Sequence, residues 1–210
     1  MKDPGFHEQP VQMGMMRRLV GAGLALVMGL ASLVGVAHAA TLNVPGTYAD
    51  IPTALASAAA NDVILVAAGT YTVSSTINAN VADVTIQGSG IGVTTLQVAS
   101  GVGNIMHITG SGTTLRDFSI EKTDTPNQDL IWVNAPNVTI RDNEIYGPDP
   151  GTPWSVNGIV SRAMVVSGGA SGLNIHDNTI HTLRQPAYIT GGDGTIANNE
   201  VYGTRGWVLE

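Results

Sequence analysis

A repeated pattern of short apolar segments, beginning at Ile105, restricts the possible folds more than any other feature of the sequence. Each copy has an apolar strand, a turn rich in Gly, Ser, Asn or Pro, a second apolar strand, a polar turn and one further apolar residue. Equivalent positions of the second strand are Leu115, Ile140, Ile175 and Ile196, which by subtraction of their numbers lie 25, 35 and 21 residues apart. Imperfect repeats of about 20 to 50 residues are typical of solenoids. Because the copies contain strands alone, we predict an all-β parallel solenoid in which each copy adds one coil.

Side chains of a strand alternate between two faces, so the same repeat predicts which residues form the core. Aligned on the second strand, two columns of the first strand are apolar in every copy. They are Met106, Ile131, Met164 and Ala187, and Ile108, Val133, Val166 and Ile189. The column between them should point outward. It contains His107, Trp132, Val165 and Tyr188, with Trp207 at the equivalent place in the last copy.

This outward column is the strongest functional signal in the sequence. Adjacent coils lie about 4.8 Å apart, so the rings should form a ladder along one face. Exposed Trp and Tyr offer large, rigid surfaces with a polar tip, on which sugar rings stack. We therefore predict that His107, Trp132, Tyr188 and Trp207 bind a polysaccharide. Two alternatives stay open: a register shifted by one residue would place the rings in the core, and exposed rings also mark protein contacts.

The composition limits the partners. The 210 residues contain 43% hydrophobic and 12% charged residues, no cysteine and a formal charge of −7. Phosphate binding requires clustered Lys and Arg, so this acidic chain is not expected to bind nucleic acid. Since no disulfide can form, the stability of the domain must come from the stacking of coils.

Residues 1–39 are predicted to be an N-terminal extension followed by a secretory signal peptide. A basic Arg17–Arg18 pair precedes the apolar run Leu19–Ala37, and Ala37–Ala39 has the small-x-small pattern of a cleavage site. The alternative is a membrane anchor, because the run is nearly long enough to span a bilayer. With cleavage near Ala39, the protein is expected to be secreted or at the cell surface, without a membrane anchor, and residues 40–210 form the solenoid domain.

A short helix is expected near the start of this domain. Asp50 can cap it, Pro52 lies in its first turn, and the apolar stripe predicts a helix over Ile51–Ala60. A solenoid requires a cap, because its first coil would otherwise expose an apolar cross-section and unpaired strand edges.

The segment TLNVPGTYADIPTALASAAANDVILVAAGTYTVSSTI from Thr41, followed by VTIQGSGIGVTTLQV from Val84, resembles the N-terminal region of the pectin-lyase-like superfamily. The segments NVTIRDNEI, GLNIHDNTI and GTIANNEV are similar to the coil repeats of the same superfamily. The resemblance covers Thr41–Glu210 and implies a single-stranded right-handed parallel β-helix. The superfamily includes pectate and pectin lyases, glycoside hydrolases, phage tailspikes and adhesins, so it does not define the activity. No catalytic motif of these enzymes can be transferred to this chain.

Two insertions, Glu121–Asp129 and Pro148–Arg162, fall at the same corner of successive coils and should form a wall beside the outward column. The wall and the shorter turns after it carry Trp154 and a set of charges: Asp124, Asp129, Asp149, Arg162, His181, Arg184 and Arg205. Loops on a rigid scaffold are frequent binding sites, which makes Trp154 a substrate-binding candidate. Uronate β-elimination requires a base and cations that neutralise the carboxylate, and Arg162 and Arg184 are candidates for the second role. The alternative is a set of solvated loop charges.

Two polar ladders are predicted at the turn after the second strand. Asn143, Asn178 and Asn199 share one position, with Phe118 in the first copy, and we assign this Asn ladder to structure because Asn tolerates left-handed backbone and can hydrogen-bond along a stack. Beside it lie Arg116–Asp117, Arg141–Asp142 and His176–Asp177. Stacked carboxylates can take up Ca²⁺, the one cofactor considered, or hydrolyse a glycosidic bond, which makes Asp142 and Asp177 catalytic candidates. The alternative is ordinary turn chemistry with neutralising Arg residues.

Two hypotheses for function follow. The first is a secreted β-helix that binds, and in one form of the hypothesis cleaves, an extracellular polysaccharide. The second is a non-catalytic structural or adhesive module of the cell surface. In this register Glu210 falls within a coil, so either the solenoid continues or a partner covers its end, and an uncapped apolar coil would favour self-association.

Overall fold

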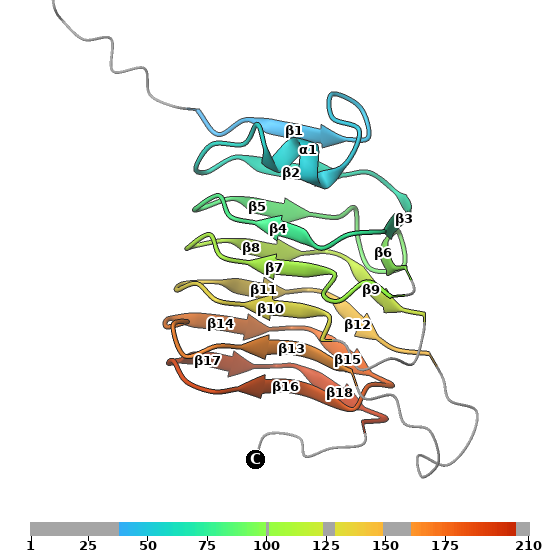
Figure 1. Cartoon of the computed structure of the whole chain (residues 1–210), viewed down its shortest axis with the longest axis vertical. Coiled ribbons are helices and arrows are strands. Elements are labelled where there is room, and N and C mark those ends of the chain that lie inside the picture. The colour runs from blue at the N-terminus through green and yellow to red at the C-terminus, as the bar shows by residue number, and fades with distance from the viewer. Residues whose placement is uncertain (1–37, 100, 124–128, 149–160, 205–210) are drawn as a thin grey trace, which may run out of the picture. The chain divides into compact units, whose positions relative to one another are not determined.

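The computed structural model describes residues 38–99, 101–123, 129–148 and 161–204, and in these ranges the chain forms a parallel β-solenoid of about six turns. Every pairing between its strands is parallel, and three sheets run along the stack (Figure 1). As the chain descends, strands of the sheet in front run to the left and strands of the sheet behind run to the right, which makes the solenoid right-handed (Figure 1). The predicted fold class is therefore confirmed.

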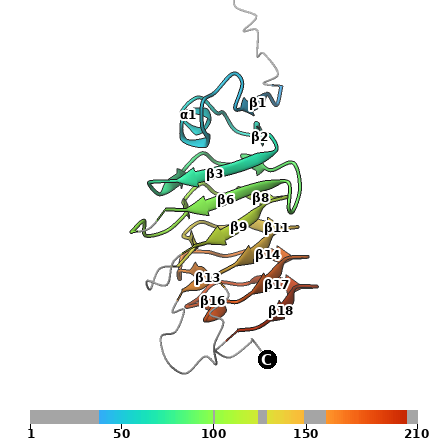
Figure 2. The same ribbon diagram turned by 90° about the vertical axis from the view of Figure 1, so that its right-hand side faces the viewer.

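From residue 77 onward each coil contributes one strand to each sheet, in the order five-stranded, seven-stranded and six-stranded sheet, whereas the first two strands of the chain both belong to the seven-stranded sheet. The five-stranded sheet contains β4 (Ile77–Ala79), β7 (Met106–Ile108), β10 (Ile131–Val133), β13 (Arg162–Val166) and β16 (Gln185–Ile189). The seven-stranded sheet contains β1 (Thr41–Val44), β2 (Val63–Val66), β5 (Thr85–Gln87), β8 (Thr114–Arg116), β11 (Thr139–Arg141), β14 (Leu173–His176) and β17 (Gly194–Ala197). The six-stranded sheet contains β3 (Gly69–Val73), β6 (Thr94–Val98), β9 (Ser119–Lys122), β12 (Glu144–Tyr146), β15 (Thr179–His181) and β18 (Glu200–Tyr202). Figure 2 shows the solenoid with this sheet toward the viewer.

The six-stranded sheet is a correction to the sequence-based pattern. The single apolar residue that closes each copy, such as Ile145 or Ile180, is the centre of a third strand. Its neighbours on both sides are polar or aromatic, so a strand of three residues leaves only one apolar position facing the core. A pattern of one apolar residue is too short to be distinguished from a turn by periodicity.

The predicted interior columns form the core. Met106 pairs in register with Ile131, and Ile131 with Met164, while Val133 pairs with Val166. These side chains are buried, together with the centres of the other two sheets such as Ile140. The register predicted from the repeat is therefore confirmed, and the alternative with the rings in the core is wrong.

The Asn ladder lies in this core. Asn143 and Asn178 are buried, and the side-chain oxygen of Asn178 accepts from the backbone N–H of Asn143 at 3.1 Å. The oxygen of Asn199 accepts from the N–H of Asn178 at 3.0 Å, and that of Asn143 from the N–H of Phe118 at 3.2 Å. Each Asn therefore satisfies the backbone of the coil before it, as the structural assignment predicted.

The left-handed backbone, however, belongs to the residue before each ladder Asn. Asp117, Asp142, Asp177 and Asn198 have φ between 53° and 64°. One left-handed residue directly after each of β8, β11, β14 and β17 turns the chain, and the following residue then points inward. The expectation that the ladder Asn residues themselves adopt this conformation is wrong.

The helix α1 spans Ile51–Leu55 and is shorter than the predicted Ile51–Ala60. The carboxylate of Asp50 accepts from the N–H of Thr53 at 2.8 Å, as predicted for the N-cap. After Leu55 the bonds shift to i→i−3 turns, with Ser57 donating to Ala54, so the helix ends. The role of α1 as a cap stays a prediction.

Within the described ranges, no helix has the length and apolar character that crossing a membrane requires. Residues 1–37 of the predicted N-terminal extension and signal peptide (1–39) lie outside the described residues.

Candidate functional site

The outward column lies on the five-stranded sheet, where the register places His107, Trp132, Val165 and Tyr188 side by side on successive strands. Trp132 is 43% exposed and Tyr188 is 49% exposed, whereas His107 and Val165 are half-buried. The ring centroids of His107 and Trp132 are 5.4 Å apart, and the rings are tilted by 34°. We call these four residues the aromatic ladder. Exposed faces of Trp and Tyr in one line are suited to stacking against the apolar faces of sugars.

A row of polar side chains borders the aromatic ladder where the strands of this sheet begin. We call it the polar corner: Asn104, Asp129, Arg162 and Gln185. The side chain of Asn104 donates to the carbonyl of Asp129 at 2.9 Å. Arg162 pairs with the carboxylate of Asp129 at 3.2 Å, and its Nε donates to Gln185 at 3.0 Å. The polar corner is therefore a connected network across four coils.

Arg162 joins the polar corner to the aromatic ladder. Its guanidinium lies over the ring of Tyr188, 4.8 Å from the centroid. This cation–π contact and the ion pair with Asp129 hold the planar guanidinium in one place. Tyr188 is therefore held in a defined orientation, which lowers the entropy lost when a ligand binds.

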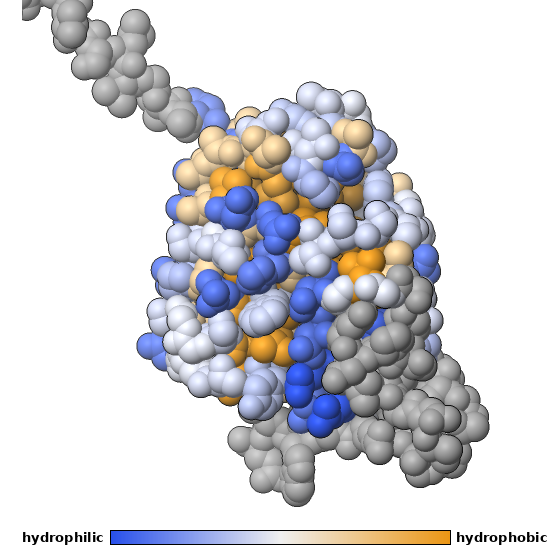
Figure 3. All heavy atoms as spheres, in the orientation of Figure 1, coloured by the Kyte–Doolittle hydropathy of each residue, from blue (hydrophilic) through white to orange (hydrophobic). Residues whose placement is uncertain are grey.

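Hydroxyl and amide groups border the aromatic ladder on its other side. They belong to Thr109, Asn134, Ser167 and Thr190, each placed directly after a strand of the five-stranded sheet. Ser167 donates to the side-chain oxygen of Asn134 at 2.7 Å, and Thr190 donates to the carbonyl of Val166 at 3.0 Å. Figure 3, which views this face, shows hydrophilic residues gathered along its lower part beside paler ones. The rings therefore lie between two rows of hydrogen-bonding groups.

The structure describes three of the five predicted substrate-binding residues. His107, Trp132 and Tyr188 form one surface, while Trp154 and Trp207 lie outside the described residues. Both insertions connect the six-stranded to the five-stranded sheet, so they leave the solenoid at the same corner as predicted. Residues 124–128 and 149–160, which would form the wall, lie outside the described ranges.

Of the four catalytic candidates, Arg162 lies on the aromatic face, and Arg184 comes directly before β16, where its N–H donates to the carbonyl of Ser161. Asp142 and Asp177 lie elsewhere, at the turn between the seven-stranded and six-stranded sheets. Asp142 is paired with Arg141, and a carboxylate oxygen of Asp177 lies 2.6 Å from Nδ1 of His176. The structure therefore does not bring the two pairs of candidates together.

These ion pairs support the turn interpretation of the carboxylates. Asp117, like Asp142, bonds to the Arg that precedes it, at 3.0 Å in the case of Arg116. Within the described ranges, no group of three or more His, Cys, Asp or Glu side chains is placed to hold a metal ion. The Ca²⁺ and hydrolase hypotheses for these residues stay predictions.

A second ladder of rings, on the six-stranded sheet, was missed in the sequence. Tyr146, His181 and Tyr202 occupy one register position on β12, β15 and β18. The rings of Tyr146 and His181 are stacked at 5.2 Å, and those of His181 and Tyr202 at 4.8 Å. Each follows the apolar centre of the third strand, a signal that becomes visible once that strand is recognised. Because these rings cover one another's faces, this stack is less suited to sugar stacking than the aromatic ladder.

The stack includes Tyr146, whose phenol is affected by its surroundings. Burial raises the pKa of Tyr146 above its ordinary value of 10.0, and the carboxylates of Glu121 and Glu144 raise this pKa further. The unfolded chain then releases the phenol proton at lower pH than the folded chain, so stability falls as pH rises above 10.0. In Tyr146→Phe this part of the loss is absent. We expect a smaller decrease of the thermal midpoint between about pH 9 and pH 11 in the variant. Identical pH profiles for the two proteins would contradict the assignment.

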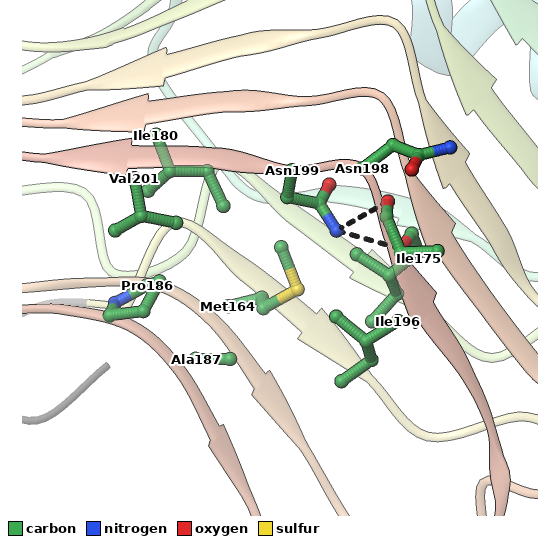
Figure 4. A pocket seen from close by; sticks show the side chains of 10 residues that line it. Met164, Ile175, Ile180, Pro186, Ala187, Ile196, Asn198, Asn199 and Val201 are labelled. Atoms are coloured by element: carbon green, nitrogen blue, oxygen red, sulfur yellow. Dashed lines mark hydrogen bonds between the residues drawn. The ribbon is translucent and has the colours of Figure 1, made fainter. Parts of the chain in front are cut away.

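A cavity of about 190 Å³ lies at the last described coils. Figure 4 shows its lining, which is mostly apolar: Met164, Ile175, Ile180, Pro186, Ala187, Ile196 and Val201, with Asn199 bonded to the carbonyl of Ile175. Met164 and Ala187 belong to the interior columns, and Ile175 and Ile180 are core residues of the other two sheets, so the cavity is lined mainly by the apolar interior rather than by polar groups. The predicted self-association through the last coil stays a prediction.

The fold and the surface together define the class of protein. It is a right-handed parallel β-solenoid whose five-stranded sheet carries the aromatic ladder between two rows of polar side chains. No protein-family model matches the chain, and none of the curated proteins matches it.

Proposed function

We propose that this protein is an extracellular, pectin-lyase-like β-helix that binds a polysaccharide along its five-stranded sheet. The observation that supports this most is the aromatic ladder, in which Trp132 and Tyr188 are exposed on a rigid sheet between two rows of hydrogen-bonding side chains. A ligand that places apolar ring faces on the aromatic ladder and hydroxyls against the flanking rows fits this arrangement. The extracellular location rests on the signal peptide predicted in residues 1–39.

Binding is tested by removing the rings one at a time. Trp132→Ala and Tyr188→Ala are each expected to weaken binding about tenfold, because a truncated aromatic contact costs about 1.4 kcal/mol or more. The measurement is retardation of the protein in native gels that contain neutral or acidic polysaccharides. The matched control is Tyr202→Ala, since Tyr202 and Tyr188 are both 49% exposed but lie on different sheets. Equal retardation of all variants and the parent protein would contradict a site on the five-stranded sheet.

The proposal extends to cleavage of the bound polysaccharide. The candidates for catalysis are Arg162, Arg184, Asp142 and Asp177. The same polysaccharides, incubated with the protein with and without Ca²⁺, distinguish its forms. Unsaturated products indicate a lyase, for which the two arginines are the candidates, whereas reducing ends alone indicate a hydrolase, for which the two aspartates are the candidates. Binding without either product leaves a binding module.

A further inference from the structure

We infer that the polysaccharide bound by the aromatic ladder is an uncharged glycan and not a polyuronate or another polyanion. This inference rests on the proposed function, since it names the substrate class of the same site. It is carried by the balance of charge on the five-stranded sheet, by the chemistry of the flanking rows and by the charge of the whole chain.

The cation that contacts the aromatic ladder, the guanidinium of Arg162, is already paired with a carboxylate. Arg162 contacts both oxygens of Asp129, at 3.2 Å and 3.4 Å, and donates to Gln185. A ligand carboxylate would have to compete with Asp129 for the guanidinium, and breaking that pair would leave Asp129 without its partner beside a second anion. Arg162 thus orients Tyr188 and contributes little net positive charge.

The sequence of the insertions and adjoining turns has the same balance of charge. It contains four carboxylates, Glu121, Asp124, Asp129 and Asp149, and four cations, Lys122, Arg162, Arg184 and Arg205. Binding of a polyanion is usually driven by a surface with excess positive charge, and no excess exists in this set. The whole chain carries a formal charge of −7, which repels a polyanion further.

The groups that flank the rings are those that recognise hydroxyls. Asn134, Ser167 and Thr190 on one side, and Asn104 and Gln185 on the other, are amides or hydroxyls without charge. Neutral donors and acceptors of this kind can exchange hydrogen bonds with the hydroxyls of a neutral sugar without the desolvation cost of burying a carboxylate. The face therefore fits a ligand that is rich in hydroxyls and has no charge.

The test compares gel retardation of the whole protein by a neutral β-glucan and a neutral galactan with retardation by polygalacturonate and alginate. Each polymer is used at about 0.01 M and about 1 M NaCl, over which the screening length falls from about 30 Å to about 3 Å. Parallel gels contain Ca²⁺ or a chelator, because bridging Ca²⁺ is the alternative route to polyuronate binding. We expect a neutral polymer to retard the protein, and this retardation should change less than about twofold between the two salt concentrations. Both polyuronates should retard the protein less in all gels.

A charge variant tests whether the pairing of Arg162 with Asp129 is what keeps polyuronate binding weak. Asp129→Asn frees the guanidinium of Arg162, so it should increase polyuronate binding about threefold at low salt, the scale of one exposed ion pair. The control is Asp83→Asn, which removes the same charge from an exposed turn where Asn is also compatible with the φ of 56°. Asp83→Asn should leave polyuronate binding as weak as in the parent protein.

The outcomes separate the inference from the proposed function. Retardation by a neutral polymer that is lost in Trp132→Ala supports both. Salt-sensitive retardation by polyuronate alone, lost in Arg162→Gln, overturns the neutral-glycan inference and keeps polysaccharide binding. Polyuronate binding that requires Ca²⁺ also overturns the inference. No retardation by any polymer overturns the proposed function itself, and the inference with it.

Discussion

Asn178→Ala is expected to lower the free energy of unfolding by about 2–6 kcal/mol, because it removes the centre of the buried Asn ladder. The side-chain oxygen of Asn178 accepts from the N–H of Asn143, and its amide donates to the carbonyl of Ile140 at 2.9 Å. After the substitution this N–H and this carbonyl lose their partners in the core. Each unsatisfied buried group costs about 1–3 kcal/mol.

The measurement is urea-induced unfolding followed by circular dichroism. The matched control is Asn174→Ala, since Asn174 is exposed on β14 of the same coil, and the expected change is within about 0.5 kcal/mol. If the two alanine variants were equally stable, the ladder would contribute no more than a surface amide, and our assignment of it to structure would be wrong.

Phe118→Ala is expected to lower the free energy of unfolding by about 3–5 kcal/mol through packing alone. Phe118 is fully buried and takes the place of an Asn at the start of the ladder. Its backbone N–H donates to the oxygen of Asn143, and alanine keeps this bond. The loss therefore comes from the cavity that the ring leaves in the core.

Phe118→Leu provides the comparison, since leucine refills much of this volume and should lose clearly less stability in the same urea experiment. If the alanine variant were as stable as the leucine variant, the surrounding coils would have to collapse into the cavity. That result would contradict the rigid stacking inferred for the core.

The interior of the solenoid was predictable because each coil repeats the same alternation. Met106, Ile131 and Met164 could be aligned from sequence alone, and the parallel register pairs them as aligned. The Asn ladder followed from the same alignment. The third strand was missed, since one apolar residue such as Ile145 gives no periodicity to detect.

The rings of the candidate site and the corner that holds Asp129 and Arg162 were predictable. His107, Trp132 and Tyr188 were assigned to one face because a strand exposes every second residue. The ion pair between Asp129 and Arg162 could not be predicted, because these residues are separated by 33 positions in the sequence. The cation–π contact of Arg162 with Tyr188 could not be predicted for the same reason.

The sequence by itself therefore determined the solenoid class, the direction of the aligned side chains in β7, β10, β13 and β16, and the line of rings, because alternation and repeat length are local properties of the chain. Only the tertiary structure decided which charges neutralise one another, which rings stack and which stay free. Those outcomes depend on contacts between coils that are 20 or more residues apart, as between Tyr146 and His181 or between His181 and Tyr202. The balance of charge beside Trp132 and Tyr188, on which the neutral-glycan inference rests, belongs to this second kind.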